Sequence, residues 1–404
     1  MARKMKDSGI EWIGEIPEGW EVGQIGQLYS ERRTKVSDKD YPPLSVTMKG
    51  ILPQLSTAAK TDAHDDRKLV CKGDFAINSR SDRRGSCGIS EQDGSISLIN
   101  TVLQPRREMN PGYYNWLFHT SLFADEFYKW GHGIVDDLWT TGWSDMKKIS
   151  VPVPSKCEQK QLAEYLNFEC FHIDSILSKT RSSIEEYKKL KQAVITQAVA
   201  TQQCSHIKLK YLMNVIVDCP HETPTYSFTG NYYVIRTADQ ALASLRRDED
   251  MYRLDASEYK KRTRRLTLDK DDIVYGREGE RWGLACIVPE SNKYCLGQRI
   301  MQFRCNTKFL YPKYAMYALN SEPVYLQGVA DTIGSTSPHV NISTICNYLL
   351  PVPALTEQKE IADYLSAKCA EIDKLIAKKE QLVKELETYK KSLIYEVVTG
   401  KREV

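Results

Sequence analysis

The residues best suited to chemistry are arginines set in short polar segments. The first segment, residues 78–85, holds Arg80, Arg83 and Arg84 among small and amide side chains and ends at a glycine. An arginine can donate two hydrogen bonds to the edge of guanine, and asparagine or glutamine can pair in the same way with adenine. Serine, threonine and backbone N–H groups commonly bind phosphate. The segment is therefore typical of a nucleic-acid contact surface, and an ordinary polar turn is the alternative.

Similar segments occur in both halves of the chain, at residues 140–144, 277–282, 297–299 and 334–339. The candidate contact residues across all five segments are Asn78, Ser79, Arg80, Arg83, Arg84, Thr141, Ser144, Arg277, Arg281, Gln298, Arg299, Ser335, Thr336 and His339. The net charge of +3 is too small to identify a nucleic-acid-binding protein, so the inference depends on these local clusters.

Catalytic motifs are not found. Residues 110–113 read Asn-Pro-Gly-Tyr, a near match to an amino-methyltransferase motif that is better explained as the start of a helix. Two Glu-Gln-Lys triplets resemble half of a nuclease motif, but their positions predict helix caps instead. A phosphate-binding P-loop is lacking, and the seven histidines show no metal-ligand spacing. We therefore expect no catalytic residue, no metal and no cofactor bound by this chain.

Composition is that of a globular protein without a membrane segment. Hydrophobic residues make up 41% of the 404 residues, and no apolar run approaches the ~18 residues that span a bilayer. The eleven cysteines form no C-x-x-C pair, which is typical of reduced thiols in the cytosol. We expect a cytoplasmic protein.

The chain repeats itself at an offset of 199 residues. Pro-Val-Pro at 152–154 and Glu-Gln-Lys at 158–160 recur at 351–353 and 357–359. The regions before these motifs match more weakly: Lys72-Gly73-Asp74-Phe75 resembles Lys270-Asp271-Asp272-Ile273, and the stretch from Tyr113 resembles that from Tyr311. A repeat of this length indicates a duplicated domain-plus-helix unit, since solenoid repeats are far shorter.

Each repeat ends in a stretch with the periodicity of a long helix. Residues 155–200 contain neither proline nor glycine, and apolar residues recur every seven positions, as two packed helices require. The main seam row is Leu166, Ile173, Thr180 and Tyr187 in the first helix and Leu365, Ile372, Lys379 and Leu386 in the second. A second row holds Leu162, Ile176, Leu190, Ile361, Leu375, Leu382 and Tyr389.

The helix ends also have recognisable signals. Ser155 and Glu158 predict a capping box, whereas Ala354 requires a different cap for the second helix. Gly400 is the expected C-terminal cap. Thr180 and Lys379 occupy equivalent seam positions and could face each other, which would fix the register of the helices.

Length arithmetic predicts the relative direction of the two helices. Each helix would be roughly 65 Å long, whereas a domain of ~150 residues is only about 40 Å across. Such a domain cannot connect the end of one helix to the start of a parallel one, so the helices should be antiparallel. The expected fold is α+β: two mixed α/β domains separated by two long antiparallel helices in a coiled-coil rod, with pseudo-two-fold symmetry. The expected boundaries are 1–154, 155–200, 205–353, 354–400 and a tail at 401–404.

Three regions resemble the specificity subunit of type I restriction–modification enzymes. They are the opening (residues 6–20), the two Pro-x-Pro…Glu-Gln-Lys helix starts, and the ending Val398-Thr399-Gly400-Lys401. The resemblance covers the whole chain. It implies two target-recognition domains that read, through the major groove, the halves of a bipartite, asymmetric DNA site. It implies too that the rod, through the seam residues named above, sets the spacing and recruits two modification subunits.

The resemblance also assigns the chemistry to partners. Modification subunits would methylate adenine with S-adenosylmethionine, restriction subunits would join the complex, and ATP and magnesium would bind to those partners. A methylation-only system is an alternative. Two more distant alternatives are a coiled-coil scaffold that binds only protein and a stand-alone DNA enzyme such as a nuclease.

Overall fold

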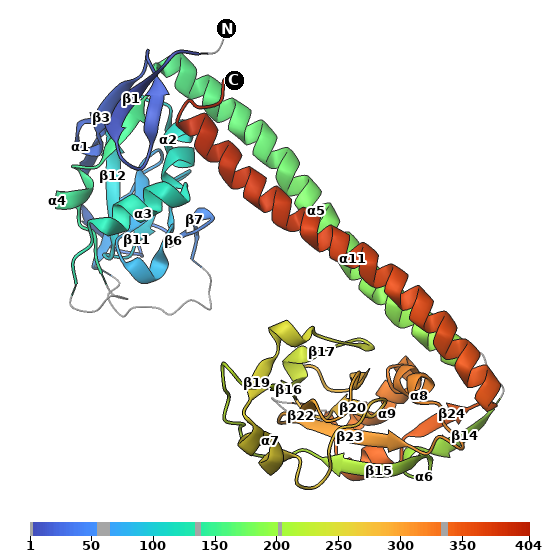
Figure 1. Cartoon of the computed structure of the whole chain (residues 1–404). Coiled ribbons are helices and arrows are strands. Elements are labelled where there is room, and N and C mark those ends of the chain that lie inside the picture. Colours follow the sequence, from blue (N-terminus) through green and yellow to red (C-terminus); the bar gives the residue numbers. More distant parts are fainter. Residues whose placement is uncertain (1–2, 55–64, 134–138, 201–203, 333–337) are drawn as a thin grey trace. The chain divides into compact units, whose positions relative to one another are not determined.

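The computed structural model describes residues 3–54, 65–133, 139–200, 204–332 and 338–404. The chain forms two compact units, Met1–Thr180 with Leu382–Val404, and Arg181–Gln381. Each unit contains one mixed α/β domain and part of each of two long helices (Figure 1). We call the domains the first head (residues 3–154) and the second head (residues 204–354).

The first head is built around a four-stranded antiparallel sheet with the order β10-β9-β12-β4. Its strands are Cys87–Ile89, Phe75–Asn78, Asn100–Pro105 and Tyr29–Glu31. A second sheet has the order β11-β8-β5, with strands Gly94–Ile96, Arg67–Val70 and Lys35–Val36. The other elements are β1 (Met5–Ile10), β2 (Gly14–Pro17), β3 (Glu21–Gln24), α1 (Ile25–Leu28), β6 (Leu44–Thr47), β7 (Gly50–Pro53), η1 (Ser81–Arg83), α2 (Pro111–Phe118), α3 (Ser121–Lys129), α4 (Trp143–Met146) and β13 (Ser150–Val153).

The second head repeats the central sheet with the order β21-β20-β23-β15. Its strands are Ala285–Ile287, Ile273–Gly276, Ile300–Cys305 and Met213–Asp218. The three-stranded sheet is β19-β16-β22 (Tyr252–Leu254, Tyr232–Ile235 and Tyr294–Leu296). The other elements are β14 (Ser205–Lys208), α6 (Leu209–Leu212), η3 (Thr237–Asp239), β17 (Gln240–Ala241), β18 (Ser244–Leu245), η4 (Asp248–Asp250), α7 (Ala256–Arg262), α8 (Pro312–Leu319), α9 (Glu322–Thr332), α10 (Ile342–Cys346) and β24 (Leu349–Val352).

The two heads differ mainly outside the central sheet. β16 pairs with β22 in parallel, whereas β8 and β11 in the first head are antiparallel. The shared sheet therefore provides a common scaffold, and the surrounding loops and small sheets are where the heads have diverged.

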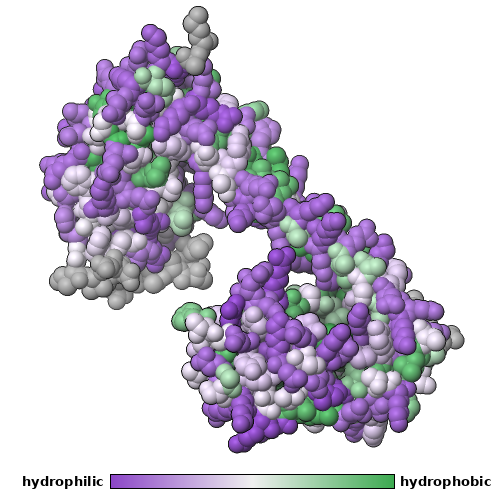
Figure 2. All heavy atoms as spheres, viewed as in Figure 1, coloured by the Kyte–Doolittle hydropathy of each residue, from purple (hydrophilic) through white to green (hydrophobic). Residues whose placement is uncertain are grey.

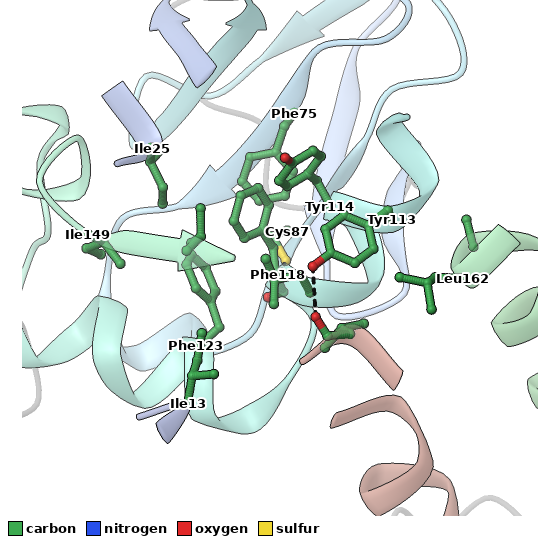
Figure 3. Packing of buried hydrophobic residues seen from close by; sticks show 14 of the residues in the cluster. Ile13, Ile25, Phe75, Cys87, Tyr113, Tyr114, Phe118, Phe123, Ile149 and Leu162 are labelled. Atoms are coloured by element: carbon green, nitrogen blue, oxygen red, sulfur yellow. Dashed lines mark hydrogen bonds between the residues drawn. The ribbon is translucent and has the colours of Figure 1, made fainter. Parts of the chain in front are cut away.

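Aromatic side chains fill the core of the first head. Phe75, Tyr114 and Phe118 pack together, with 4.7 Å between the ring centroids of Phe75 and Phe118 (Figure 3). The Tyr113 hydroxyl donates a 2.8 Å hydrogen bond to the carbonyl of Val398, near the end of the chain. The C-terminal residues therefore pack against the first head, as expected from an antiparallel helix pair.

The long helices are α5 (Lys156–Ala200) and α11 (Leu355–Val398). In the first unit, the beginning of α5 shares a buried cluster with the end of α11, including Leu166 and Leu393. In the second unit, the end of α5 shares a cluster with the beginning of α11, including Ile195 and Leu365. Because the start of each helix meets the end of the other, the antiparallel prediction is confirmed. None of the helices within the described ranges is long and apolar enough to cross a membrane.

Equivalent residues form the same ion pair in both units. Lys390 Nζ lies 2.6 Å from an oxygen of Asp174, and Lys191 Nζ lies 2.8 Å from an oxygen of Asp373. The environments differ, because Lys191 is 5% exposed and also donates to the carbonyl of Leu242, whereas Lys390 is 24% exposed. The Lys191–Asp373 pair is therefore partly desolvated, whereas the Lys390–Asp174 pair lies at the surface.

This difference predicts unequal effects of two equivalent substitutions. Asp373→Ala leaves a buried ammonium group without its counter-ion and is expected to cost about 2 kcal/mol of unfolding free energy. Asp174→Ala, the matched control, is expected to cost under about 1 kcal/mol, as exposed ion pairs do. Chemical denaturation of the two full-length variants measures both values, and equal losses would contradict the assignment.

The main seam row is mostly confirmed. Leu166, Ile173, Leu365 and Ile372 are buried, and Thr180 is 7% exposed. Tyr187, Lys379 and Leu386 are half-buried, and Lys379 Nζ lies 5.7 Å from the Tyr187 ring centroid. The expected facing of Thr180 and Lys379 spans the two units and stays a prediction.

The second apolar row is a correction to the predicted seam. Leu162 and Ile361 are buried, but five other members of the row are 36–47% exposed. They are Ile176, Leu190, Leu375, Leu382 and Tyr389. Two helices can bury only a narrow stripe, so a row on its outer side stays in solvent. Apolar patches along the helices are visible among hydrophilic residues in Figure 2.

The helix caps follow the sequence signals. The Glu158 carboxylate accepts the backbone N–H of Ser155 at 3.2 Å, and the Ser155 hydroxyl accepts the N–H of Glu158 at 3.4 Å. In the second copy only the glutamate half remains: Glu357 accepts the N–H of Ala354 at 3.1 Å. Gly400 follows α11 with a φ of +73°, which suits glycine at a helix end.

The repeated glutamine connects each head to its helix. In the first unit, Gln159 accepts the N–H of Asn110 at 2.9 Å and donates to the carbonyl of Pro154. In the second, Gln358 accepts the N–H of Tyr311 at 2.8 Å and donates to the carbonyls of Phe309 and Pro353. Both side chains are buried, so the triplets are structural, as the capping interpretation requires.

Candidate nucleic-acid interface

Backbone hydrogen bonds join three loops of the first head where its strands end. Ser79 follows β9, and its carbonyl accepts the N–H of Thr141 at 2.9 Å. The N–H of Ser81 donates to the carbonyl of Trp139 at 2.9 Å, and the N–H of Ser79 donates to that of Ile99 at 3.3 Å. Two of the segments predicted from sequence, 78–85 and 140–144, are therefore adjacent, with Arg80 and Thr140 paired across a β-bridge.

The second head has the same three bonds at equivalent positions. The carbonyl of Arg277 accepts the N–H of Val340 at 3.1 Å, and the N–H of Arg277 donates to the carbonyl of Arg299 at 2.9 Å. The N–H of Gly279 donates to the carbonyl of Pro338 at 2.8 Å, and Glu278 pairs with His339 across a β-bridge. We call this arrangement the loop frame; it comprises residues 79–81, 99 and 139–141 in the first head and 277–279, 299 and 338–340 in the second.

Exposed arginines lie on the loop frame of the first head or directly after it. Arg80 is exposed, and the side chain of Arg83 is 70% exposed. Arg84 forms an ion pair with Asp125, and its guanidinium lies 5.7 Å from the ring centroid of Tyr128. Burial raises the pKa of Tyr128, whose hydroxyl donates to the carbonyl of Asn78 and so supports the loop. These arginines are presented to solvent in the way that phosphate or base contact requires.

Four predicted contact residues are buried and support the loops, so their contact with DNA stays a prediction. Asn78 accepts the N–H of Arg80, the Ser79 hydroxyl bonds to that of Thr101, and the Thr141 hydroxyl donates to the carbonyl of Phe127. Arg277 is 5% exposed. These hydrogen bonds lie within the protein, although Asn78 also lines a pocket beside Arg80.

Arg277 lies at the centre of a charge network in the second head. Its guanidinium contacts Asp218 at 3.3 Å and Glu278 at 2.5 Å. The Glu278 carboxylate also lies 3.2 Å from Nδ1 of His339 and 4.0 Å from Nε of Arg299. The buried arginine thus holds a carboxylate in place beside two exposed groups, since the side chains of His339 and Arg299 are 45% and 55% exposed.

The remaining predicted residues are less closely associated with the frame. Ser144 is exposed and bonds to Asp145. Arg281 donates to two carbonyl oxygens of the segment 238–240, and Gln298 donates to the carbonyl of His221 at 3.4 Å. Ser335 and Thr336 lie outside the described residues.

Sequence reasoning missed Ile99 and Glu278. Ile99 is 37% exposed and lines a pocket of about 860 Å³ together with Arg80, Arg83 and Leu52. An apolar residue and an acidic residue do not have the composition of a DNA-binding segment, so neither was a candidate. The repeat gave no signal at these positions, because its offset of 199 residues places Ile99 opposite Gln298 and Glu278 opposite Ser79, whereas the backbone bonds pair them with Arg299 and Arg80.

Comparisons with known proteins agree with this architecture. Residues 219–386 match the family model of the type I restriction modification DNA specificity domain. The specificity subunit of the type I restriction enzyme MjaVIII from Methanocaldococcus jannaschii is 22% identical over 419 residues, which cover 96% of this chain and 93% of that protein.

Two solved structures share the fold. A chain from a structure of complex assembly and conformational transition in a type I R-M system has a TM-score of 0.73 at 13% identity and covers 96% of this chain and 99% of its own. The HsdS subunit from Thermoanaerobacter tengcongensis has a TM-score of 0.52 at 15% identity, with coverage of 96% and 98%. Residues 219–386 therefore belong to the type I restriction modification DNA specificity domain family, and along nearly its whole length the chain is similar to a type I restriction enzyme specificity subunit.

Proposed function

We propose that each head reads one half of a bipartite, asymmetric DNA site through the major groove. The loop frame supports this proposal, because the two heads hold three loops with the same backbone bonds but present different side chains. A shared frame with different side chains suits two different half-sites. The paired helices would then set the number of unspecified bases between the halves, since each helix is continuous over more than forty residues.

The exposed apolar row suggests where partners bind. Ile176 and Leu190 are equivalent in the repeat to Leu375 and Tyr389, and all four are at least 36% exposed. We propose that these two equivalent surfaces, beside the seam, bind two modification subunits that methylate adenine, and that restriction subunits join this core in the cytoplasm of a prokaryote. S-adenosylmethionine, ATP and magnesium would bind to those partners, and this chain would contribute recognition without catalysis.

Methylome sequencing tests the proposal. The full chain is expressed with its modification subunit in a host free of other adenine methylation, and every methylated site is mapped. The expected result is a motif of two defined halves separated by a fixed number of undefined bases. Replacing residues 205–353 with the matching domain of another specificity subunit should change one half alone. A single undivided motif, or a change in both halves, would contradict the proposal.

A further inference from the structure

Three positions of the loop frame are equivalent in the two heads and hold unlike side chains. Each is defined by a backbone bond or bridge that occurs in both heads. The positions are Arg80, Ile99 and Thr140 in the first head and Glu278, Arg299 and His339 in the second. The backbone bonds are alike at these positions, so the two surfaces differ in their side chains and in the backbone of Arg299, whose φ is positive whereas that of Ile99 is not.

We infer that these positions determine sequence specificity, with Arg299, positioned by Glu278, reading a guanine in one half-site and Ile99 contacting a thymine methyl group in the other. The inference rests on the proposed function, and it adds which residues discriminate and which base each selects. Arginine bonds bidentately to the O6 and N7 atoms of guanine, and apolar side chains contact the 5-methyl group of thymine.

Arg299 has an unusual backbone conformation that directs it outward. Its φ is +69°, in the left-handed region that an arginine rarely adopts. The residue is held there by its N–H, which donates to Sγ of Cys219 at 3.1 Å, and by its carbonyl, which accepts from Arg277. Burial raises the pKa of Cys219, so this sulfur remains a neutral thiol. Uncommon backbone conformations held by their surroundings often mark functional positions.

The carboxylate of Glu278 lies beside the guanidinium of Arg299 and limits its orientations. Its carboxylate lies between Arg299 and His339 and is fixed by the buried Arg277, which Asp218 holds in turn. A carboxylate facing DNA opposes the approach of phosphate, so a role in affinity would not explain its presence. Its closest partner is the buried Arg277, and at 4.0 Å from Nε of Arg299 its charge also favours some orientations of that guanidinium over others, which matters because a bidentate contact requires the guanidinium in one plane.

Ile99 gives the first head a different surface at the equivalent position. Both Ile99 and its neighbour Leu98 are more than a third exposed, and Ile99 lines the same pocket as Arg80. An apolar pair beside an arginine can pack on a methyl group while the arginine bonds to a phosphate or an adjacent base. The two heads are therefore expected to select different base pairs at corresponding places.

Variants at position 299 test the second head without risk of misfolding. Arg299→Gly removes the guanidinium and should fold at least as well, because glycine adopts this backbone conformation without strain. Arg299→Lys keeps the charge but not the planar fork. In the methylome assay with the full complex, each variant is expected to lose about 5- to 100-fold of the preference for one guanine in one half-motif. The other half-motif should be unchanged.

Two further variants separate the roles of the neighbouring groups. Glu278→Gln should weaken the preference for the same guanine but leave the affinity for DNA equal or higher, since it removes a negative charge. If Glu278 had only a structural role, both the preference and the affinity would fall. Ile99→Ser should weaken the preference for thymine at one position of the opposite half-motif. Arg264→Ala, at an exposed arginine outside the frame, is the control and should leave both half-motifs intact.

The results distinguish this inference from the proposed function. A wild-type complex that methylates no bipartite motif would contradict the proposed function itself. A wild-type bipartite motif that Arg299→Gly and Arg299→Lys leave unchanged would overturn the inference alone. So would relaxation of both halves by one variant, because each head is expected to act on its own half-site.

Discussion

Gln358→Leu is expected to destabilise the junction between the second head and α11 by about 3 kcal/mol. The glutamine amide is fully buried and forms three hydrogen bonds, with the N–H of Tyr311 and the carbonyls of Phe309 and Pro353. Leucine has a similar volume but leaves these three backbone groups without partners, and each such group costs about 1–3 kcal/mol, partly offset by the burial of apolar surface. Hydrogen exchange of the full chain measures the local loss at the start of α8 and α11.

The repeat provides the controls for this substitution. Gln159→Leu removes two bonds rather than three, so it should cost about 2 kcal/mol and act on the first head. Lys359→Ala changes the exposed member of the same triplet and should be neutral within about 0.5 kcal/mol. If Gln358→Leu and Lys359→Ala had equal effects, the glutamine would not be the connection between head and helix.

Asp272→Ala is expected to destabilise the second head by about 3 kcal/mol. The Asp272 carboxylate is 2% exposed, accepts two hydrogen bonds of 2.8 Å from Arg304 and one of 2.6 Å from Gln302, and accepts the N–H of Asp269. The hydrogen bonds that Arg304 donates to Asp272 raise the pKa of Arg304, so the arginine is charged at every accessible pH. Removal of the carboxylate leaves that charge and the amide of Gln302 without their main partner.

The neighbouring aspartate is the matched control. Asp271 is exposed with a φ of +70°, so Asp271→Gly should be neutral or slightly stabilising. Urea unfolding followed by hydrogen exchange in β20 and β23 separates the second head from the first, which should be unaffected. A loss below about 1 kcal/mol for Asp272→Ala would show that the carboxylate is not central to this head.

The equivalent aspartate in the first head explains part of the repeat. Asp74 accepts the N–H of Cys71 at 2.8 Å and two hydrogen bonds from Arg32, at 2.6 and 3.2 Å. The weak similarity between residues 72–75 and 270–273 therefore reflects a structural carboxylate used twice. The arginine that bonds to this aspartate is Arg32, directly after β4, in the first head and Arg304, within β23, in the second. Because the two arginines come from different strands, the sequence match extends no further.

The amino-acid sequence was enough to predict the long helices, their capping residues, their antiparallel direction and the duplicated architecture. These features follow from local patterns, such as the heptad spacing that places Leu166 and Ile173 on one face, and from chain length. The capping roles of Glu158 and Glu357 were accessible for the same reason, because a cap involves residues only three positions apart.

The exposure of the candidate residues and the contacts between loops could be read only from the folded chain. Arg277 and Arg299 look alike in the sequence, but one is buried against Asp218 and the other extends into solvent. Burial of this kind depends on strand order, and the bonds that join Ser79 to Ile99 and Thr141 connect loops distant in the chain. Periodicity and composition describe one segment at a time, so they could identify basic segments but not the frame that assembles them.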